Sequence, residues 1–77
     1  MEENLIVFGT RLKELRKEKK LKQTEMAELL ELAPRNYQRL EYGKTNATAT
    51  TLMFLGDYFH VSVDYLLGRT DSRAINR

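Results

Sequence analysis

The stretch QTEMAELLELAPRNYQRLEYGK, Gln23 to Lys44, decides the fold because it holds two short helical patterns separated by about three residues. Apolar side chains recur at helical spacing in both patterns, and they are Met26, Ala27, Leu30, Tyr37 and Leu40. This spacing predicts helices over roughly 23–30 and 34–41, with Gly43 suited to a left-handed cap after the second. Two helices that cross steeply over a turn this short form a helix-turn-helix unit.

The second of these helices has an outer face that packing does not explain. Only Tyr37 and Leu40 form its apolar side, whereas polar and basic residues occupy the other side, namely Arg35, Asn36, Gln38 and Arg39. In a helix-turn-helix unit the second helix presents such side chains to base edges in the major groove of DNA. We therefore interpret these four residues as base readers. The alternatives are that Arg39 pairs with an acid of a neighbouring helix and that Gln38 is only solvated. Arginine can bond guanine in a fork, whereas Asn36 and Gln38 can pair with adenine or contact phosphate.

The flanking sequence is helical as well. Apolar side chains at helical spacing predict three further helices. The first carries the stripe Phe8, Leu12 and Leu15 and ends near Lys19, and the other two have their apolar faces over residues 52–59 and 63–67. Thr48 and Ser62 are suited to cap the last two. With 77 residues and no linker, repeat or strand pattern, we expect one compact all-α domain of five helices over residues 1–71. A flexible tail is expected over residues 72–77.

Positive charge is clustered although the net charge is only +2. Residues 11–22 carry seven basic side chains against two acidic ones. Clustered bases in a nearly neutral chain indicate a surface that faces a polyanion. A solvated helix face would give the same pattern, so charge alone leaves both interpretations open.

Composition argues against several classes of function. The chain has no cysteine, which excludes disulfides and thiolate metal sites. His60 is its single histidine, so a catalytic triad or a metal site of the usual kind is not expected. We therefore expect no enzymatic activity, no metal and no cofactor. The apolar run from Leu5 to Phe8 is too short for a signal segment or a membrane span, which favours a cytoplasmic protein without membrane contact.

A wider resemblance rests on Gln23, Ala27, Glu41, Gly43 and the stretch VSVDYLLG, residues 61–68. With these residues at these intervals, the chain resembles the phage repressor and Cro type of helix-turn-helix domain, also called XRE-like. The resemblance covers roughly Phe8 to Asp71. It implies a repressor-like fold and a transcriptional regulator, in the first instance a repressor, that binds a symmetric double-stranded DNA operator.

Contacts to the DNA backbone are expected on both sides of the reading helix. A helix start attracts phosphate, and the resemblance implies that Gln23 contacts the DNA there. Lys22 would add charge, and Lys44, Thr45 and Asn46 form a loop suited to hold a phosphate from the other side. Such contacts position a protein on DNA without specifying sequence. The alternative for Gln23 is an ordinary solvated side chain.

The resemblance also implies a partly buried ion pair between Arg16 and Glu41, which we expect to be structural. The alternative is that Arg16 contacts phosphate.

Four positions depart from the family pattern. Glu31 stands where the turn usually has glycine, and Ala33 stands where the third helix usually opens with serine or threonine, so that cap is expected to be lost. Lys22 replaces another capping hydroxyl, and Pro34 replaces a side chain that could read a base. A non-glycine residue in the left-handed conformation costs roughly 1–2 kcal/mol, so a differently shaped turn is the alternative at Glu31.

One short helix reads only a few base pairs, so we expect a homodimer on half-sites about 34 Å apart. The exposed part of the fourth and fifth helices is the expected contact, at Met53, Val61 and Tyr65. Many members of the XRE-like family dimerise through a further C-terminal domain, so an alternative is that the chain is a fragment of a longer regulator. The alternative function is a protein-interaction module, such as an antitoxin or adaptor, on the same scaffold.

Overall fold

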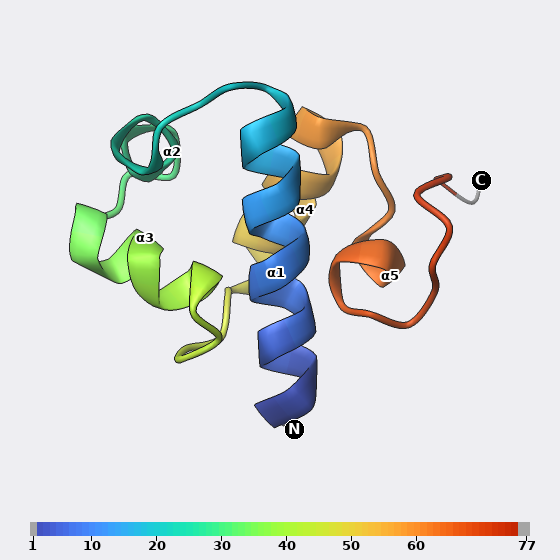
Figure 1. Ribbon diagram of the computed structural model, residues 1–77. Helices are drawn as coiled ribbons and strands as arrows, with labels where there is room; N and C mark the ends of the chain where they lie inside the picture. Colours follow the sequence, from blue (N-terminus) through green and yellow to red (C-terminus); the bar gives the residue numbers. More distant parts are fainter. Residues whose placement is uncertain (1, 76–77) are drawn as a thin grey trace.

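A computed structural model describes residues 2–75, which form five helices and no β-strand. The helices are α1 (Glu2–Glu18), α2 (Gln23–Leu29), α3 (Pro34–Glu41), α4 (Ala49–Phe59) and α5 (Val63–Leu66). Figure 1 shows α1 in the middle, with α2 and α3 on one side of it and α5 on the other. The prediction of an all-α, five-helix domain is confirmed. Within the described range no helix is long and apolar enough to cross a membrane.

The apolar faces of the five helices and the α4–α5 loop meet in one core. Its buried side chains are Phe8, Leu12, Leu15, Met26, Ala27, Tyr37, Leu40, Leu55, Phe59, Val61, Tyr65 and Leu66. Helix α3 packs against both α1 and α2, and α5 packs against α1 and α4. The reading helix expected from the sequence is therefore held by two other helices rather than by its own short apolar side alone.

Two residues that the sequence suggested for a dimer contact lie in this core. Val61 is only 3% exposed and Tyr65 only 6%. Val61 turns inward because His60 takes a left-handed conformation at the end of α4, with φ of 56°. Tyr65 lies beneath the guanidinium groups of Arg11 on α1 and of Arg73 in the segment after α5. The expectation was wrong for both residues, whereas Met53 on α4 is 62% exposed.

Helix α1 crosses the end of α3 at very short range because α1 has a glycine at position 9. A Cβ atom on Gly9 would lie 2.4 Å from the backbone oxygen of Glu41 and 2.7 Å from that of Leu40. Only a residue without a side chain allows backbones to approach this closely. The end of α3 is thereby held against α1, the helix that also carries Arg16.

The turn between α2 and α3 is left-handed although it contains no glycine. Glu31 has a φ of 57°, which costs an L-residue roughly 1–2 kcal/mol. The backbone N–H of Leu32 donates to the carbonyl of Ala27 at 2.8 Å and closes the end of α2. Helix α3 then begins after Ala33 without a side-chain cap, and Pro34 takes its first position. Glu31 thus keeps the left-handed backbone conformation that glycine usually takes in this turn. Helix α3 lacks a side-chain cap at Ala33, as expected.

Residues after α5 run back toward α1. The backbone N–H of Ser62 donates to the carbonyl of Arg73 at 3.0 Å, and the Arg73 guanidinium pairs with Glu18 at 2.6 Å. Arg11 on α1 also pairs with Asp71 at 2.8 Å. The first part of the expected tail therefore contacts the helical body. The boundary after residue 71 stays a prediction, and residues 1, 76 and 77 of the expected domain and tail lie outside the described part.

Candidate functional site

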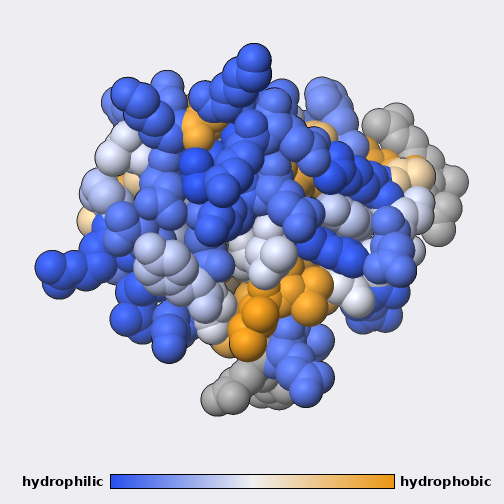
Figure 2. Space-filling model, in the orientation of Figure 1, coloured by the Kyte–Doolittle hydropathy of each residue, from blue (hydrophilic) through white to orange (hydrophobic). Residues whose placement is uncertain are grey.

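The outer side of α3 carries the four side chains that the sequence singles out. Arg35, Asn36 and Arg39 are exposed, and Gln38 is half-buried. The described residues contain four ion pairs, and none of them includes Arg35 or Arg39. Both guanidinium groups therefore face solvent, and Arg39 does not pair with an acid of a neighbouring helix in this structure. On the face drawn in Figure 2 the surface is mainly hydrophilic, with an apolar patch in the lower half of the view.

A shallow hollow lies between α3 and the start of α4. Its lining includes Asn36, Arg39, Thr45 and Asn46, together with Thr48 and other residues of the loop that joins the two helices. Two expected base readers and two expected phosphate contacts thus meet around one depression. Donor groups gathered in this way can contact an anion or the edge of a base.

The remaining expected contacts lie elsewhere around α3. Lys22 and Gln23 are at the start of α2, where Lys22 is exposed and Gln23 is half-buried. Lys44 is exposed just after α3, and its backbone N–H donates to the carbonyl of Arg39 at 2.9 Å. The backbone N–H of Lys22 is occupied by the Glu25 carboxylate at 2.8 Å. Basic side chains therefore stand at both ends of the α2–α3 unit.

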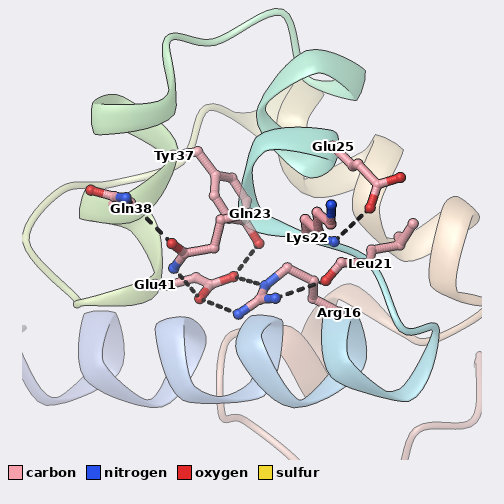
Figure 3. Close-up of polar contacts among 8 residues, drawn as sticks. All are labelled: Arg16, Leu21, Lys22, Gln23, Glu25, Tyr37, Gln38 and Glu41. Carbon is pink, nitrogen blue, oxygen red and sulfur yellow. Dashed lines mark hydrogen bonds and ion pairs between the residues drawn. The ribbon is translucent and has the colours of Figure 1, made fainter.

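A polar network joins α1, α2 and α3 beneath the outer face (Figure 3). Arg16 donates from Nε and Nη2 to the two carboxylate oxygens of Glu41, at 2.6 and 3.2 Å, and both residues are buried. The Arg16 Nη1 group donates to the carbonyl of Leu21 at 2.8 Å. The hydroxyl of Tyr37 and the Nε2 group of Gln23 also donate to Glu41, the latter at 3.0 Å. Arg16 thus faces inward to Glu41 in this structure.

These hydrogen bonds keep Glu41 ionised. Burial by itself would raise the pKa of the Glu41 carboxyl, but the donors of Arg16, Tyr37 and Gln23 outweigh burial and hold its pKa below the ordinary value of 4.5. The same carboxylate raises the pKa of Arg16, and burial together with Glu41 raises the pKa of Tyr37. At neutral pH the Glu41 carboxylate therefore only accepts hydrogen bonds, and the side chains around it donate them.

The sequence interpretation did not foresee how large this network is. It treats Tyr37 as an apolar anchor, and it takes Gln23 and Gln38 as DNA contacts or solvated side chains, without a contact to Glu41. The signal for Tyr37 is present in the sequence, because residues 37 and 41 are four apart and therefore adjacent on one helix face. No comparable signal exists for Gln23, since it reaches Glu41 from another helix.

A family profile described as helix-turn-helix matches residues 12–66, which include α2, α3 and most of the core. The chain belongs to the helix-turn-helix family. The resemblance to the XRE type of helix-turn-helix domain is confirmed. Its two defining helices are α2 and α3.

Curated relatives of this helix-turn-helix chain come from Bacillus subtilis strain 168. The SPbeta prophage-derived uncharacterized HTH-type transcriptional regulator YonR is 36% identical over 67 residues, which are 87% of this chain and 62% of YonR. The HTH-type transcriptional regulator ImmR is 36% identical over 64 residues, which are 83% of this chain and 50% of ImmR. The chain therefore spans between half and two thirds of the length of these relatives.

A solved structure with the same architecture is the restriction-modification controller protein C.AhdI from Aeromonas hydrophila. Its crystal structure matches with a TM-score of 0.69 and 31% sequence identity, over 80% of this chain and 94% of that one. The helix-turn-helix arrangement of α2 and α3 is thus supported by both sequence and structure.

Proposed function

We propose that the chain binds double-stranded DNA as a transcriptional regulator, in the first instance a repressor, and that α3 reads base edges in the major groove. The observation that carries this proposal is the contrast between the two sides of α3. Tyr37 and Leu40 are buried beneath the helix, whereas Arg35 and Arg39 extend into solvent without an ion-pair partner among the described residues. A bidentate contact of arginine with guanine is worth about 1–3 kcal/mol of discrimination.

Groups suited to contact phosphate lie on both sides of this reading helix. Lys22 and the start of α2 lie on one side of α3, and Lys44, Thr45 and Asn46 follow it on the other. Contacts of this kind set the register and orientation of a protein on the duplex. They release counterions, so the affinity for DNA falls steeply as salt rises. In this proposal the chain acts by binding alone, without a cofactor and without catalysis, in the cytoplasm.

Two copies on a symmetric operator complete the proposal. The largest dimension of the domain is 32 Å and half-site centres are about 34 Å apart, so two copies fit side by side at that spacing. With Val61 and Tyr65 in the core, Met53 is the one of the three predicted contact residues that is exposed for a contact between copies. Sedimentation that shows only monomers, both free and on operator DNA, would remove the dimer from this proposal.

The experiment that tests DNA binding is a gel shift with random-sequence duplex and with a selected operator, at low and at high salt. Wild type should bind more weakly at high salt. The double variant Arg35→Ala, Arg39→Ala should lose tenfold or more in operator affinity, since each contact contributes about 1–3 kcal/mol. If this variant binds the operator as well as wild type does, the assignment of α3 is wrong.

A matched control removes the same charge from the opposite side of the molecule. Arg69 and Arg73 lie after α5, across α1 from α3 (Figure 1), so the double variant Arg69→Ala, Arg73→Ala should retain operator binding. The alternative function, a protein-interaction module, predicts that wild type itself shows no salt-dependent binding to DNA.

A further inference from the structure

We propose that the buried Arg16–Glu41 pair sets the amide orientation of Gln38 through Gln23, so that Gln38 offers its carbonyl oxygen to an amino group on a base edge. This inference rests on the proposed function and deepens it, because it names the base chemistry at one position of each half-site. Gln23 is the positioning residue, and Gln38 is the residue that contacts the base.

The first step is the orientation of Gln23. The Glu41 carboxylate can only accept hydrogen bonds, and Gln23 lies 3.0 Å from its Oε1 atom. The amide nitrogen of Gln23 must therefore face Glu41, because a reversed amide would set two acceptor oxygens against each other. Arg16 holds Glu41 in place from the opposite direction with two hydrogen bonds. The buried pair thus leaves Gln23 one favourable orientation.

The second step transfers this orientation to α3. With its nitrogen on Glu41, Gln23 turns its Oε1 atom toward Gln38, whose Nε2 donates to it at 3.3 Å. Figure 3 shows the carbonyl end of Gln38 pointing away from Gln23 and from the rest of the network. Gln38 follows Arg35 by three residues, so the two side chains are neighbours on the helix surface. The oxygen of Gln38 is therefore presented on the side of α3 that carries the base readers.

The third step is the chemistry that such an oxygen recognises. Phosphate oxygens, guanine O6 and thymine O4 are acceptors like the amide oxygen of Gln38, so they are unsuitable partners for it. The N6 amino group of adenine and the N4 amino group of cytosine donate in the major groove. The second N–H of the Gln38 amide can also reach adenine N7, which gives a bidentate contact. Adenine is therefore preferred and cytosine comes second, which decides the choice between adenine and phosphate that the sequence left open for Gln38.

Asn36 supplies a natural contrast on the same helix. It is exposed, and its side chain makes no hydrogen bond within residues 2–75. Nothing among the described residues sets the direction of its amide, so Asn36 can present either its oxygen or its nitrogen. Both residues carry an amide group, but the amide of Gln38 is held in one orientation and the amide of Asn36 is not.

The test is a selection of bound duplexes from random sequence with wild type, Gln38→Ala, Gln23→Ala and Asn36→Ala. Wild type should select adenine at one position of each half-site, and Gln38→Ala should lose that preference. Gln23→Ala should admit guanine at this same position, with the ratio of adenine to guanine affinity falling about fivefold or more. Asn36→Ala should leave the adenine preference at this position unchanged.

Circular dichroism would show whether the variants remain helical, and Gln23→Met, which keeps the side-chain length, replaces Gln23→Ala if that variant does not fold. A uniform loss of affinity in the Gln23 variant with the adenine preference intact overturns the inference. So does a wild type whose Gln38-dependent position selects guanine or has no preference. Failure of wild type to bind DNA at all overturns the proposed function itself, which distinguishes the two failures.

Discussion

Two arginine–glutamate pairs in this domain have the same contact distance and opposite surroundings. Arg16 with Glu41 and Arg73 with Glu18 each have a closest contact of 2.6 Å between nitrogen and oxygen. In the first pair the side chains are 10% and 0% exposed, whereas in the second they are 44% and 52% exposed. The first pair also receives hydrogen bonds from Tyr37 and Gln23.

The difference teaches that the surroundings of an ion pair, rather than its length, decide what its loss costs. An exposed pair is screened by water and salt and holds two flexible side chains in one geometry, so its net contribution is small. A buried pair contributes modestly compared with well-packed apolar residues, but removing one partner leaves a charge away from water. The three following predictions test this comparison between the two pairs.

The largest effect is expected from Glu41→Gln. The substitution leaves the Arg16 guanidinium buried without its counter-charge, and the new amide group brings a donor toward Tyr37 and Gln23, which are donors themselves. The free energy of unfolding should fall by about 3–5 kcal/mol. Urea denaturation followed by circular dichroism measures the change, and an unfolded variant would place the loss at the upper end of the range.

Glu18→Gln is the matched control for this substitution, because it makes the same chemical change in the exposed pair. Its unfolding midpoint should lie close to that of wild type. Equal losses in the two variants would contradict the comparison, since burial would then have no influence.

A smaller effect is expected on acidification. Because the pKa of Glu41 is lowered in the folded state, its contribution is fully present above the ordinary pKa of 4.5 and is lost as pH falls through the lower, folded-state pKa. The hydrogen bond from Arg73 also lowers the pKa of Glu18, but this group is exposed. Urea midpoints measured between pH 7 and pH 3 should therefore fall in wild type and in Glu18→Gln alike. An acid-insensitive Glu18→Gln variant would show that the exposed pair carries the pH dependence.

The smallest effect is expected from Arg73→Ala. Arg73 lies over the Tyr65 ring as well as beside Glu18, but its backbone contact with Ser62 survives the substitution. The urea midpoint should fall slightly at low salt. The part of this fall that comes from losing the ion pair with Glu18 should mostly vanish at 1 M salt, where the screening length is about 3 Å. A large shift that persists at 1 M salt would show that this segment is held mainly by packing.

Local sequence signals predicted the helices well because helix formation depends on near neighbours. The expected third helix, 34–41, matches α3, and the expected second helix, 23–30, is one residue longer than α2. Thr48 and Ser62 accept hydrogen bonds from the backbone N–H groups of Thr51 and Tyr65, as expected of caps. Such signals do not show what covers a helix, which explains the error at Val61 and Tyr65.

The sequence by itself determined the five helices, the family and the polar outer side of α3, since spacing, caps and charge patterns act over a few residues. The roles of the individual base-reading and phosphate-binding residues stay predictions. Only the tertiary structure decided which polar groups meet at Glu41, because Arg16 is 25 residues away in the chain and Gln23 is 18 residues away. Hydrogen-bond direction depends on all partners at once, so the orientation of Gln38 exists only when α1, α2 and α3 are packed together.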